Sequence, residues 1–203
     1  TIKDIIKEPL DIHNIGSFSE REDAVVEILR TVGLTPPENY MSRYPHEISG
    51  GQRQRVSIAR TLVMKPKFVV CDEPTSMLDV SIRISIMDLM LNLAKELDVS
   101  YLYITHDLAV ARYMCNRIAV MFNGKIVEIA ETEELLNNPI HPYTKRLISS
   151  IPIPDPSYKR ERYEMNFDEL DNIIQNNPNE KMVNIGSEHF VATHETKDFF
   201  IES

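Results

Sequence analysis

The stretch from Ser49 to His106 constrains the fold more than any other part of the sequence. Within it, a Ser-Gly-Gly turn opens a helical pattern, and two apolar runs each end in polar side chains. Ligands of open parallel α/β sheets collect at the carboxyl ends of the strands. The order of these pieces therefore predicts a ligand site at one edge of such a sheet.

The turn Ser49-Gly50-Gly51-Gln52 has the composition of an anion-binding helix start. A hydroxyl and unobstructed backbone N–H groups would face a phosphate where the helix dipole is positive. A pair of glycines before a helix is usually only a turn. The prediction of a phosphate contact therefore depends on the other pieces of the stretch.

The apolar run at 68–71 leads into Asp72 and Glu73, and the run at 101–105 leads into His106. We expect a buried strand to place Asp72 as a ligand of Mg²⁺, directly or through water. Glu73 then polarises an attacking water, and His106 contacts the γ-phosphate. A lone histidine after a strand is more often structural, so its role depends on the order of the whole stretch.

In this order the motifs resemble those of the ATP-binding subunits of ABC transporters. Positions 49–52 are similar to the signature motif, 68–73 to the Walker B strand with its catalytic glutamate, 76–79 to the D-loop, and His106 to the switch histidine. The resemblance implies ATP and Mg²⁺ as cofactors. It also implies a set of residues that touch ATP across a dimer interface: Ser49, Gly50, Gly51, Gln52 and Asp79.

An ATPase of this type also needs a phosphate loop, Gly-x-x-x-x-Gly-Lys-Ser/Thr, and the 203 residues contain none. The single Gly-Lys pair, Gly124-Lys125, lies in a hairpin-turn pattern and is followed by Ile126. We therefore expect the chain to be the later part of a longer subunit, with its Walker A loop before Thr1, or a remnant gene.

Composition narrows the partners. With 22 basic and 31 acidic residues the net charge is -9, which disfavours a nucleic-acid partner. No apolar run approaches the ~20 residues that a membrane-spanning helix needs, so we expect any membrane role to be peripheral. Only Cys71 and Cys115 are present, too few for a disulfide framework or a zinc site.

Periodicity predicts helices and strands in alternation. A helix at 1–10 is expected to stop at Pro9, and a capping box of Ser19 and Glu22 to open an amphipathic helix that ends at Gly33. The remaining predicted helices are 52–64, 81–97, 108–114, 131–137 and one from His141, and the predicted strands are 68–71, 101–105, 117–122 and 125–129, the last two joined by Asn123-Gly124. Alternating strands and helices imply an α/β fold with a parallel sheet.

The segment His141-Pro142-Tyr143-Thr144 resembles the carboxyl-terminal extension of ATPase subunits that drive oligopeptide, dipeptide and nickel importers. We therefore expect a partial P-loop NTPase-like ABC ATPase fold with three parts. These are a helical subdomain at 1–64, the later half of the parallel-sheet core at 65–138, and the importer-type extension at 139–203. A proline-spaced linker is expected at 151–156.

The favoured function is ATP hydrolysis that powers an ABC importer for peptides or nickel. The resemblance implies a second ATPase subunit in a homo- or heterodimer, transmembrane permease subunits, an indirect link to an extracytoplasmic solute-binding protein, and a place on the cytoplasmic face of the membrane. One alternative is a non-catalytic remnant that contributes a signature face to a complete partner. Another is a soluble ABC-type ATPase, which the acidic charge and the His-Pro-Tyr-Thr segment disfavour.

Overall fold

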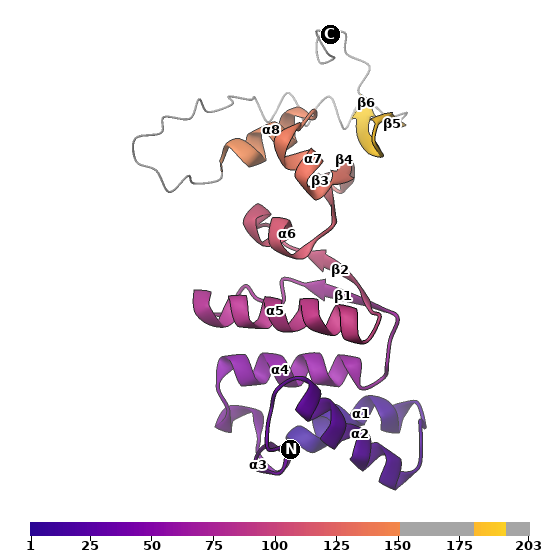
Figure 1. The fold of residues 1–203 in the computed structure, drawn as a ribbon, viewed down its shortest axis with the longest axis vertical. Coiled ribbons are helices and arrows are strands. Elements are labelled where there is room, and N and C mark those ends of the chain that lie inside the picture. The colour runs from indigo at the N-terminus through magenta and orange to yellow at the C-terminus, as the bar shows by residue number, and fades with distance from the viewer. Residues whose placement is uncertain (151–180, 194–203) are drawn as a thin grey trace. The chain divides into compact units, whose positions relative to one another are not determined.

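The computed structural model describes residues 1–150 and 181–193, and the chain forms two compact units, Thr1–Ile104 and Thr105–Ser203 (Figure 1). The predicted linker at 151–156 and most of the predicted extension lie outside the described residues. No helix in the described part of the chain is long and apolar enough to cross a membrane.

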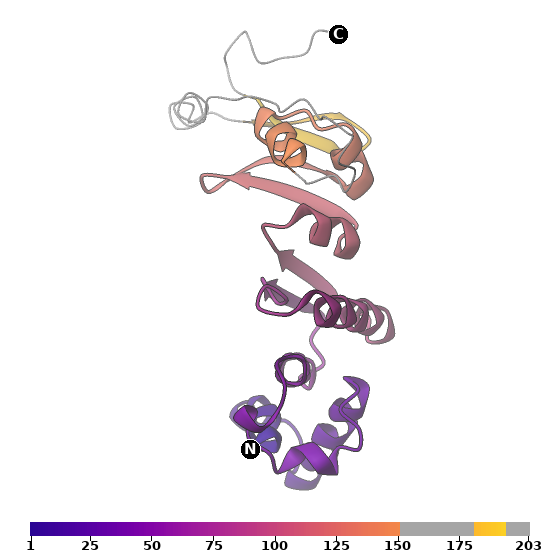
Figure 2. The ribbon, with the colours of Figure 1, turned by 90° about the vertical axis from the view of Figure 1, so that its left-hand side faces the viewer.

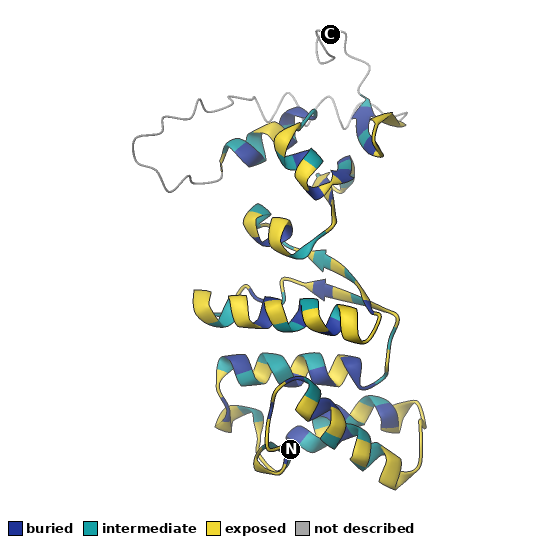
Figure 3. Ribbon diagram, in the orientation of Figure 1, coloured by how far each residue is buried: buried dark blue, intermediate teal, exposed yellow. Residues whose placement is uncertain are grey.

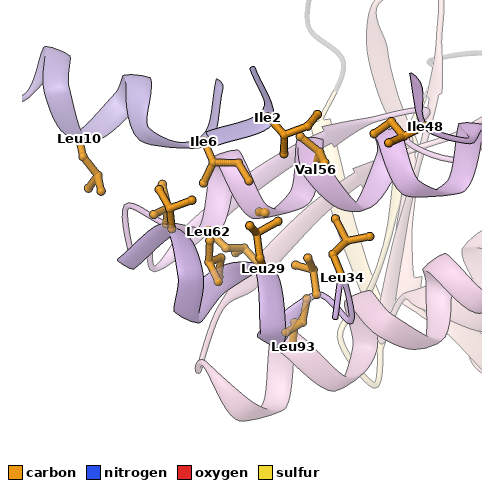
Figure 4. Close-up of a cluster of buried hydrophobic side chains, with 14 of the residues drawn as sticks. Ile2, Ile6, Leu10, Leu29, Leu34, Ile48, Val56, Leu62 and Leu93 are labelled. Atoms are coloured by element: carbon orange, nitrogen blue, oxygen red, sulfur yellow. The ribbon is translucent and has the colours of Figure 1, made fainter. Parts of the chain in front are cut away.

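The first unit contains a group of helices followed by two parallel strands. Its elements are α1 (Ile2–Ile12), α2 (Phe18–Thr31), α3 (Glu38–Met41), the 3₁₀ turn η1 (Pro45–Glu47), α4 (Gly50–Leu62), β1 (Phe68–Asp72), α5 (Val80–Glu96) and β2 (Ser100–Ile104). Helices α1 and α2 pack against each other and against α4, as the indigo and purple helices in Figure 2 show. The core between them is built from aliphatic side chains, among them Ile2, Ile6, Leu29, Val56 and Leu62 (Figure 4).

Helix α1 runs past Pro9 to Ile12, so the prediction that it stops at Pro9 was wrong. An internal proline removes one backbone hydrogen bond and costs about 3 kcal/mol. Contacts beyond Pro9 offset that cost. Leu10 is 3% exposed in the core, and Asp11 accepts a 2.7 Å hydrogen bond at Oδ1 from Nη1 of Arg21. Packing therefore overrides the local signal.

The capping box of α2 was predicted two residues too late. Ser17 is the N-cap: its hydroxyl accepts from the backbone N–H of Glu20, and the Glu20 carboxylate accepts from the backbone N–H of Ser17. The predicted apolar face of this helix is buried, and Gly33 follows it with φ +75°. Two overlapping Ser-x-x-Glu patterns occur here, and the sequence alone does not choose between them.

Strands β1 and β2 form a two-stranded parallel sheet in which Asp72 pairs with Ile104. The prediction that the Walker B strand is buried was wrong for most of its residues. Phe68 and Val70 on β1 are 58% and 56% exposed, and only Cys71 is buried. The physical reason is that the sheet has no third strand in the described residues, so α5 and α4 shield one side of it and nothing shields the other.

Helix α5 matches its predicted range to within one residue at each end. Its inward side is formed by Ile86, Met90 and Leu93, which are 2% exposed or less, and Figure 3 shows the same alternation of buried and exposed positions along the ribbon. Leu97, at the end of the predicted range, is 40% exposed because the helix has ended and the chain turns away at Asp98.

The second unit consists of α6 (Leu108–Met114), β3 (Arg117–Phe122), β4 (Lys125–Glu131), α7 (Thr132–Asn137), α8 (Pro142–Ser149), β5 (Lys181–Gly186) and β6 (His189–Thr193). The predicted hairpin is confirmed: β3 and β4 pair in antiparallel fashion around Asn123 and Gly124, which both have positive φ. The sheet has the order β3-β4-β6-β5. Strands β5 and β6 were not predicted. The chain therefore has an antiparallel sheet in addition to the predicted parallel strands β1 and β2.

Candidate functional site

The turn at Ser49 has the geometry of a helix N-terminus open to an anion. Ser49 is the N-cap of α4; its hydroxyl oxygen accepts from the backbone N–H of Gln52 at 3.3 Å, and Oε1 of Gln52 accepts from the Ser49 N–H at 3.0 Å. Because the hydroxyl acts here as an acceptor, its own proton is available to a ligand. No acidic residue occupies the first turn, so the positive end of the dipole is not neutralised locally.

The two glycines of the turn have different surroundings. A Cβ added to Gly51 would lie 2.8 Å from Cγ2 of Ile82 on α5, closer than real Cβ contacts come. At Gly50 the nearest atom, Cδ2 of Leu78, would lie at an ordinary 3.8 Å. Gly51 therefore lets α4 approach α5, whereas Gly50 has room for a side chain. Through these contacts the signature turn and the D-loop form one surface.

Asp72 ends β1, and its side chain is exposed. Glu73 follows with φ +43°, in the left-handed region that non-glycine residues seldom occupy. Its backbone N–H donates to the carbonyl of Ile104 at 2.9 Å, and its own carbonyl accepts from the N–H and hydroxyl of Ser76 at 3.2 and 3.0 Å. The backbone thereby turns sharply at the point where the two carboxylates emerge.

These carboxylates suit Mg²⁺ in a particular way. No group of three or more metal-ligating side chains occurs among the residues with a described position. Mg²⁺ keeps several waters and is commonly held by one or two carboxylates together with substrate phosphates. Asp72, exposed at the strand end, fits that pattern, since the remaining ligands would come from the nucleotide and water.

Asp79 occupies the N-cap position of α5, but its side chain makes no capping hydrogen bond. Met77, two residues earlier, is 98% exposed. Asp79 is also exposed, so the D-loop presents an acidic and an apolar side chain to solvent.

His106 is exposed and lies between β2 and α6, in the second unit, whereas the other predicted site residues lie in the first. Its neighbour Asp107 caps α6 by accepting at Oδ1 from the N–H groups of Ala109 and Val110. The Asp107 N–H in turn donates to the Thr105 hydroxyl at 3.0 Å. These bonds fix the backbone on both sides of His106.

A hollow of about 190 Å³ lies between α4 and β1, with Asp72, Cys71 and Tyr101 in its lining. Burial raises the pKa of the Cys71 thiol to about 11, which keeps it protonated and unreactive at neutral pH. Burial, and next the neighbouring Cys71, raise the pKa of Tyr101 to about 12. Neither this thiol nor this phenol is therefore poised for acid–base chemistry near neutral pH.

Comparison with known families covers the segments that carry these features. A family described as "ABC transporter" matches residues 3–76, which include the signature turn and the Asp72-Glu73 pair. A second family, described as "Oligopeptide/dipeptide transporter, C-terminal region", matches residues 127–181. Residues 3–76 are thus similar to the ABC transporter family, and residues 127–181 to the carboxyl-terminal region of oligopeptide and dipeptide transporters. Asp79 and His106 lie outside both matched ranges.

Similar ABC proteins share the oligopeptide or dipeptide description. The chain is 46% identical over 198 residues to the oligopeptide transport ATP-binding protein OppF of Bacillus subtilis (strain 168), covering 97% of this chain and 64% of that protein. It is 53% identical over 163 residues to AmiF of Streptococcus pneumoniae, covering 80% and 52%. It is 46% identical over 200 residues to the dipeptide transport ATP-binding protein DppF of Lactococcus lactis, covering 97% and 62%. The chain thus spans less than two thirds of these relatives.

A solved inward-facing structure of a metal-chelate type ABC transporter also resembles the chain, with a TM-score of 0.60 and 26% identity. The match covers 67% of this chain and 54% of the other. Together with the parallel strand pair and the flanking helices, it establishes a partial ABC ATPase fold.

Sequence reasoning missed residues that pack against the predicted site residues from neighbouring elements. Ile82 receives Gly51, and a hydrogen bond of 3.1 Å joins the hydroxyls of Thr75 and Tyr103. None of them belongs to a motif. The one available signal is the alternation of side chains along β2. It puts Tyr101 and Tyr103 on the same face of the sheet.

Proposed function

We propose that these residues form the signature and Walker B part of an ATP-hydrolysing subunit that powers an ABC importer for peptides. The observation that carries the proposal is the joint surface of the signature turn and the D-loop, where Gly51 packs on Ile82 and Gly50 faces Leu78. A helix N-terminus with free N–H groups on such a surface can take a phosphate that another subunit holds. The choice of peptides as the transported solute follows the names of the relatives, which are oligopeptide and dipeptide transport ATP-binding proteins.

The proposed roles follow the chemistry of each group. Ser49 donates its hydroxyl proton, and the backbone N–H groups of Gly50 and Gly51 donate to the γ-phosphate of a nucleotide across the interface. Gln52 and Asp79 border that contact. ATP supplies the phosphoryl group, and Mg²⁺ would neutralise charge developing on its oxygens.

Asp72 would hold Mg²⁺, and the Glu73 carboxylate would accept a proton from the attacking water. His106 would donate to or orient the γ-phosphate from the start of the second unit. These assignments require the chain segments around Asp72 and His106 to be completed by a phosphate loop, because phosphoryl transfer depends on positioning and electrostatics.

The proposal extends to organisation and partners. We assign residues 1–64 to a helical subdomain, 65–138 to the later half of the catalytic core, and 139–203 to the importer-type extension. The partners are a second ATPase subunit and transmembrane permease subunits, with the solute-binding protein reached indirectly, at the cytoplasmic face of the membrane. The separate family match at 127–181 supports a distinct carboxyl-terminal region.

The test compares the 203-residue chain with the same chain joined to a Walker A segment from a relative. The chain alone is expected to bind ATP weakly and not to turn it over, because no Gly-x-x-x-x-Gly-Lys loop is present to hold the phosphates. The joined protein is expected to bind ATP in a Mg²⁺-dependent manner and to hydrolyse it. Micromolar ATP binding by the chain alone, or a joined protein that binds no ATP, would overturn the proposal.

A further inference from the structure

The backbone of Glu73 is strained, and the structure shows what holds it. A non-glycine residue at φ +43° is conformationally strained and persists only where its surroundings fix it. The Glu73 N–H is tied to the end of β2 at Ile104, and its carbonyl is tied to Ser76. Hydrogen bonds therefore hold the turn at its first residue, Glu73, and at its fourth, Ser76.

A side-chain contact holds the turn at a third residue, Thr75, between these two. Thr75 is 4% exposed, and its hydroxyl lies 3.1 Å from the hydroxyl of Tyr103. Tyr103 on β2 pairs with Cys71 on β1, one residue before the register pair of Asp72 and Ile104 that precedes the turn. The Thr75–Tyr103 pair thus links the middle of the turn to β2, whereas the backbone bond to Ile104 links only its first residue, Glu73.

We propose that Tyr103 is a positioning residue for Glu73: it holds Thr75, and through Thr75 it keeps the 73–76 turn in the conformation that aims the Glu73 carboxylate. The inference rests on the proposed function, in which Glu73 is the general base. Proton abstraction requires the base within hydrogen-bond reach of its water, so a small rotation of the turn reduces the rate without removing any catalytic group.

Tyr101 provides a matched control on the same strand and the same face. Its hydroxyl is buried and has no hydrogen-bond partner among the residues whose positions are described. Tyr101→Phe therefore removes the same atom as Tyr103→Phe without breaking such a bond. Any effect common to both variants reports the loss of a tyrosine hydroxyl, and the difference between them reports the interactions of the Tyr103 hydroxyl, which include the bond to Thr75.

The first experiment measures amide hydrogen exchange in the 203-residue chain as it stands. Tyr103→Phe is expected to accelerate exchange at the Glu73 and Ser76 amides about five-fold, the effect of losing one ordinary hydrogen bond, while amides of α1 keep their rates. Tyr101→Phe is expected to change neither group. Equal exchange rates of the Glu73 amide in Tyr103→Phe and Tyr101→Phe would overturn the proposal.

Thr75→Val breaks the same bond from the other side and covers the case in which Tyr103→Phe unfolds the chain. It is expected to accelerate the same two amides, and the double variant to add little to either single change, because both remove one interaction. A double variant whose effects simply add would contradict a direct link between the two hydroxyls.

The second experiment measures steady-state ATP turnover in the protein joined to a Walker A segment. Tyr103→Phe is expected to lower kcat about ten-fold with the KM for ATP within about two-fold, and Tyr101→Phe to leave both unchanged. A joined wild type without turnover would refute the proposed function, and the exchange result would still decide the positioning of Glu73. Turnover that Tyr103→Phe leaves intact would refute the positioning role alone.

Discussion

The Glu128 carboxylate and the His189 imidazole meet in the interior of the second unit, with Oε1 2.7 Å from Nε2 and the two side chains 0% and 2% exposed. The same carboxylate accepts from the backbone N–H groups of Ile140 and His141 at 2.8 and 3.0 Å. One side chain therefore joins β4, the segment that starts α8, and β6. The His-Pro-Tyr-Thr segment begins at this junction, and the His141 Nδ1 accepts from the N–H of Tyr143.

We expect His189→Leu to destabilise the second unit by about 3 kcal/mol, because it removes the imidazole from a buried carboxylate that is then held only by its two backbone N–H donors among the described residues. Urea unfolding of the chain measures the change. Glu133→Ala is the control, since it breaks an exposed pair with Arg112, and it is expected to change stability little. Equal effects of the two variants would contradict the junction.

Much of the fold was predictable where local signals are strong. The ranges of α6 and β3 match their predicted bounds because Asp107 caps the helix and Asn123-Gly124 sets the hairpin. Strand β5 had no such signal, since all six of its residues are exposed and, among the described strands, it pairs with β6 alone. The end of α1 was missed because burial of Leu10 outweighs the proline before it.

The candidate site divides in the same way. Ser49, Gly50, Asp72 and Glu73 belong to contiguous motifs, whose composition reveals the chemistry directly. The contact of Gly51 with a residue on α5 depends on how two helices pack, and single-sequence patterns contain no information on such distances. The left-handed backbone of Glu73 likewise depends on a hydrogen bond to Ile104 on β2, 31 residues further along the chain.

The two signature glycines should respond differently to alanine. Gly51→Ala is expected to lower the free energy of unfolding by about 1–3 kcal/mol, since its Cβ would meet Ile82 at 2.8 Å. Gly50→Ala is expected to be neutral or slightly stabilising, because it has room and alanine favours a helix. Thermal unfolding of both variants distinguishes them.

Ile82→Ala provides the control for that comparison. If the steric contact is the cause, the variant that combines Gly51→Ala with Ile82→Ala loses less stability than the sum of the two single changes. Strict additivity would show that Gly51 is needed for some reason other than the contact with Ile82.

Stability should fall at alkaline pH through Cys71. Burial raises the pKa of this thiol from 9.0 to about 11, so the folded chain keeps a proton that the unfolded chain releases. The stabilisation is complete below pH about 9 and is lost as the pH rises towards 11. Cys71→Ala is expected to flatten the decline of the unfolding free energy between pH about 9 and about 11. A slope identical to that of the wild type would exclude this thiol as its source.

Asp72→Asn should act on metal affinity. An amide oxygen binds Mg²⁺ less strongly than a carboxylate, so turnover of the protein joined to a Walker A segment is expected to fall and to recover partly at high Mg²⁺. Titration of turnover with Mg²⁺ gives the shift in the half-saturating concentration. A rate that no Mg²⁺ concentration improves would argue against a metal role for Asp72.

Glu73→Gln should separate binding from chemistry in the same joined protein. Glutamine keeps the size and the hydrogen bonding of the side chain and leaves the backbone ties to Ile104 and Ser76 in place. It cannot accept the proton of the attacking water, and loss of a general base costs about 10²–10⁴ in rate. Turnover is therefore expected to fall by that factor while Mg²⁺-dependent ATP binding is retained, which equilibrium binding and single-turnover assays measure side by side. Because the variant preserves the strained turn, a loss of ATP binding would indicate a structural defect, and near-normal turnover would remove Glu73 from the role of general base.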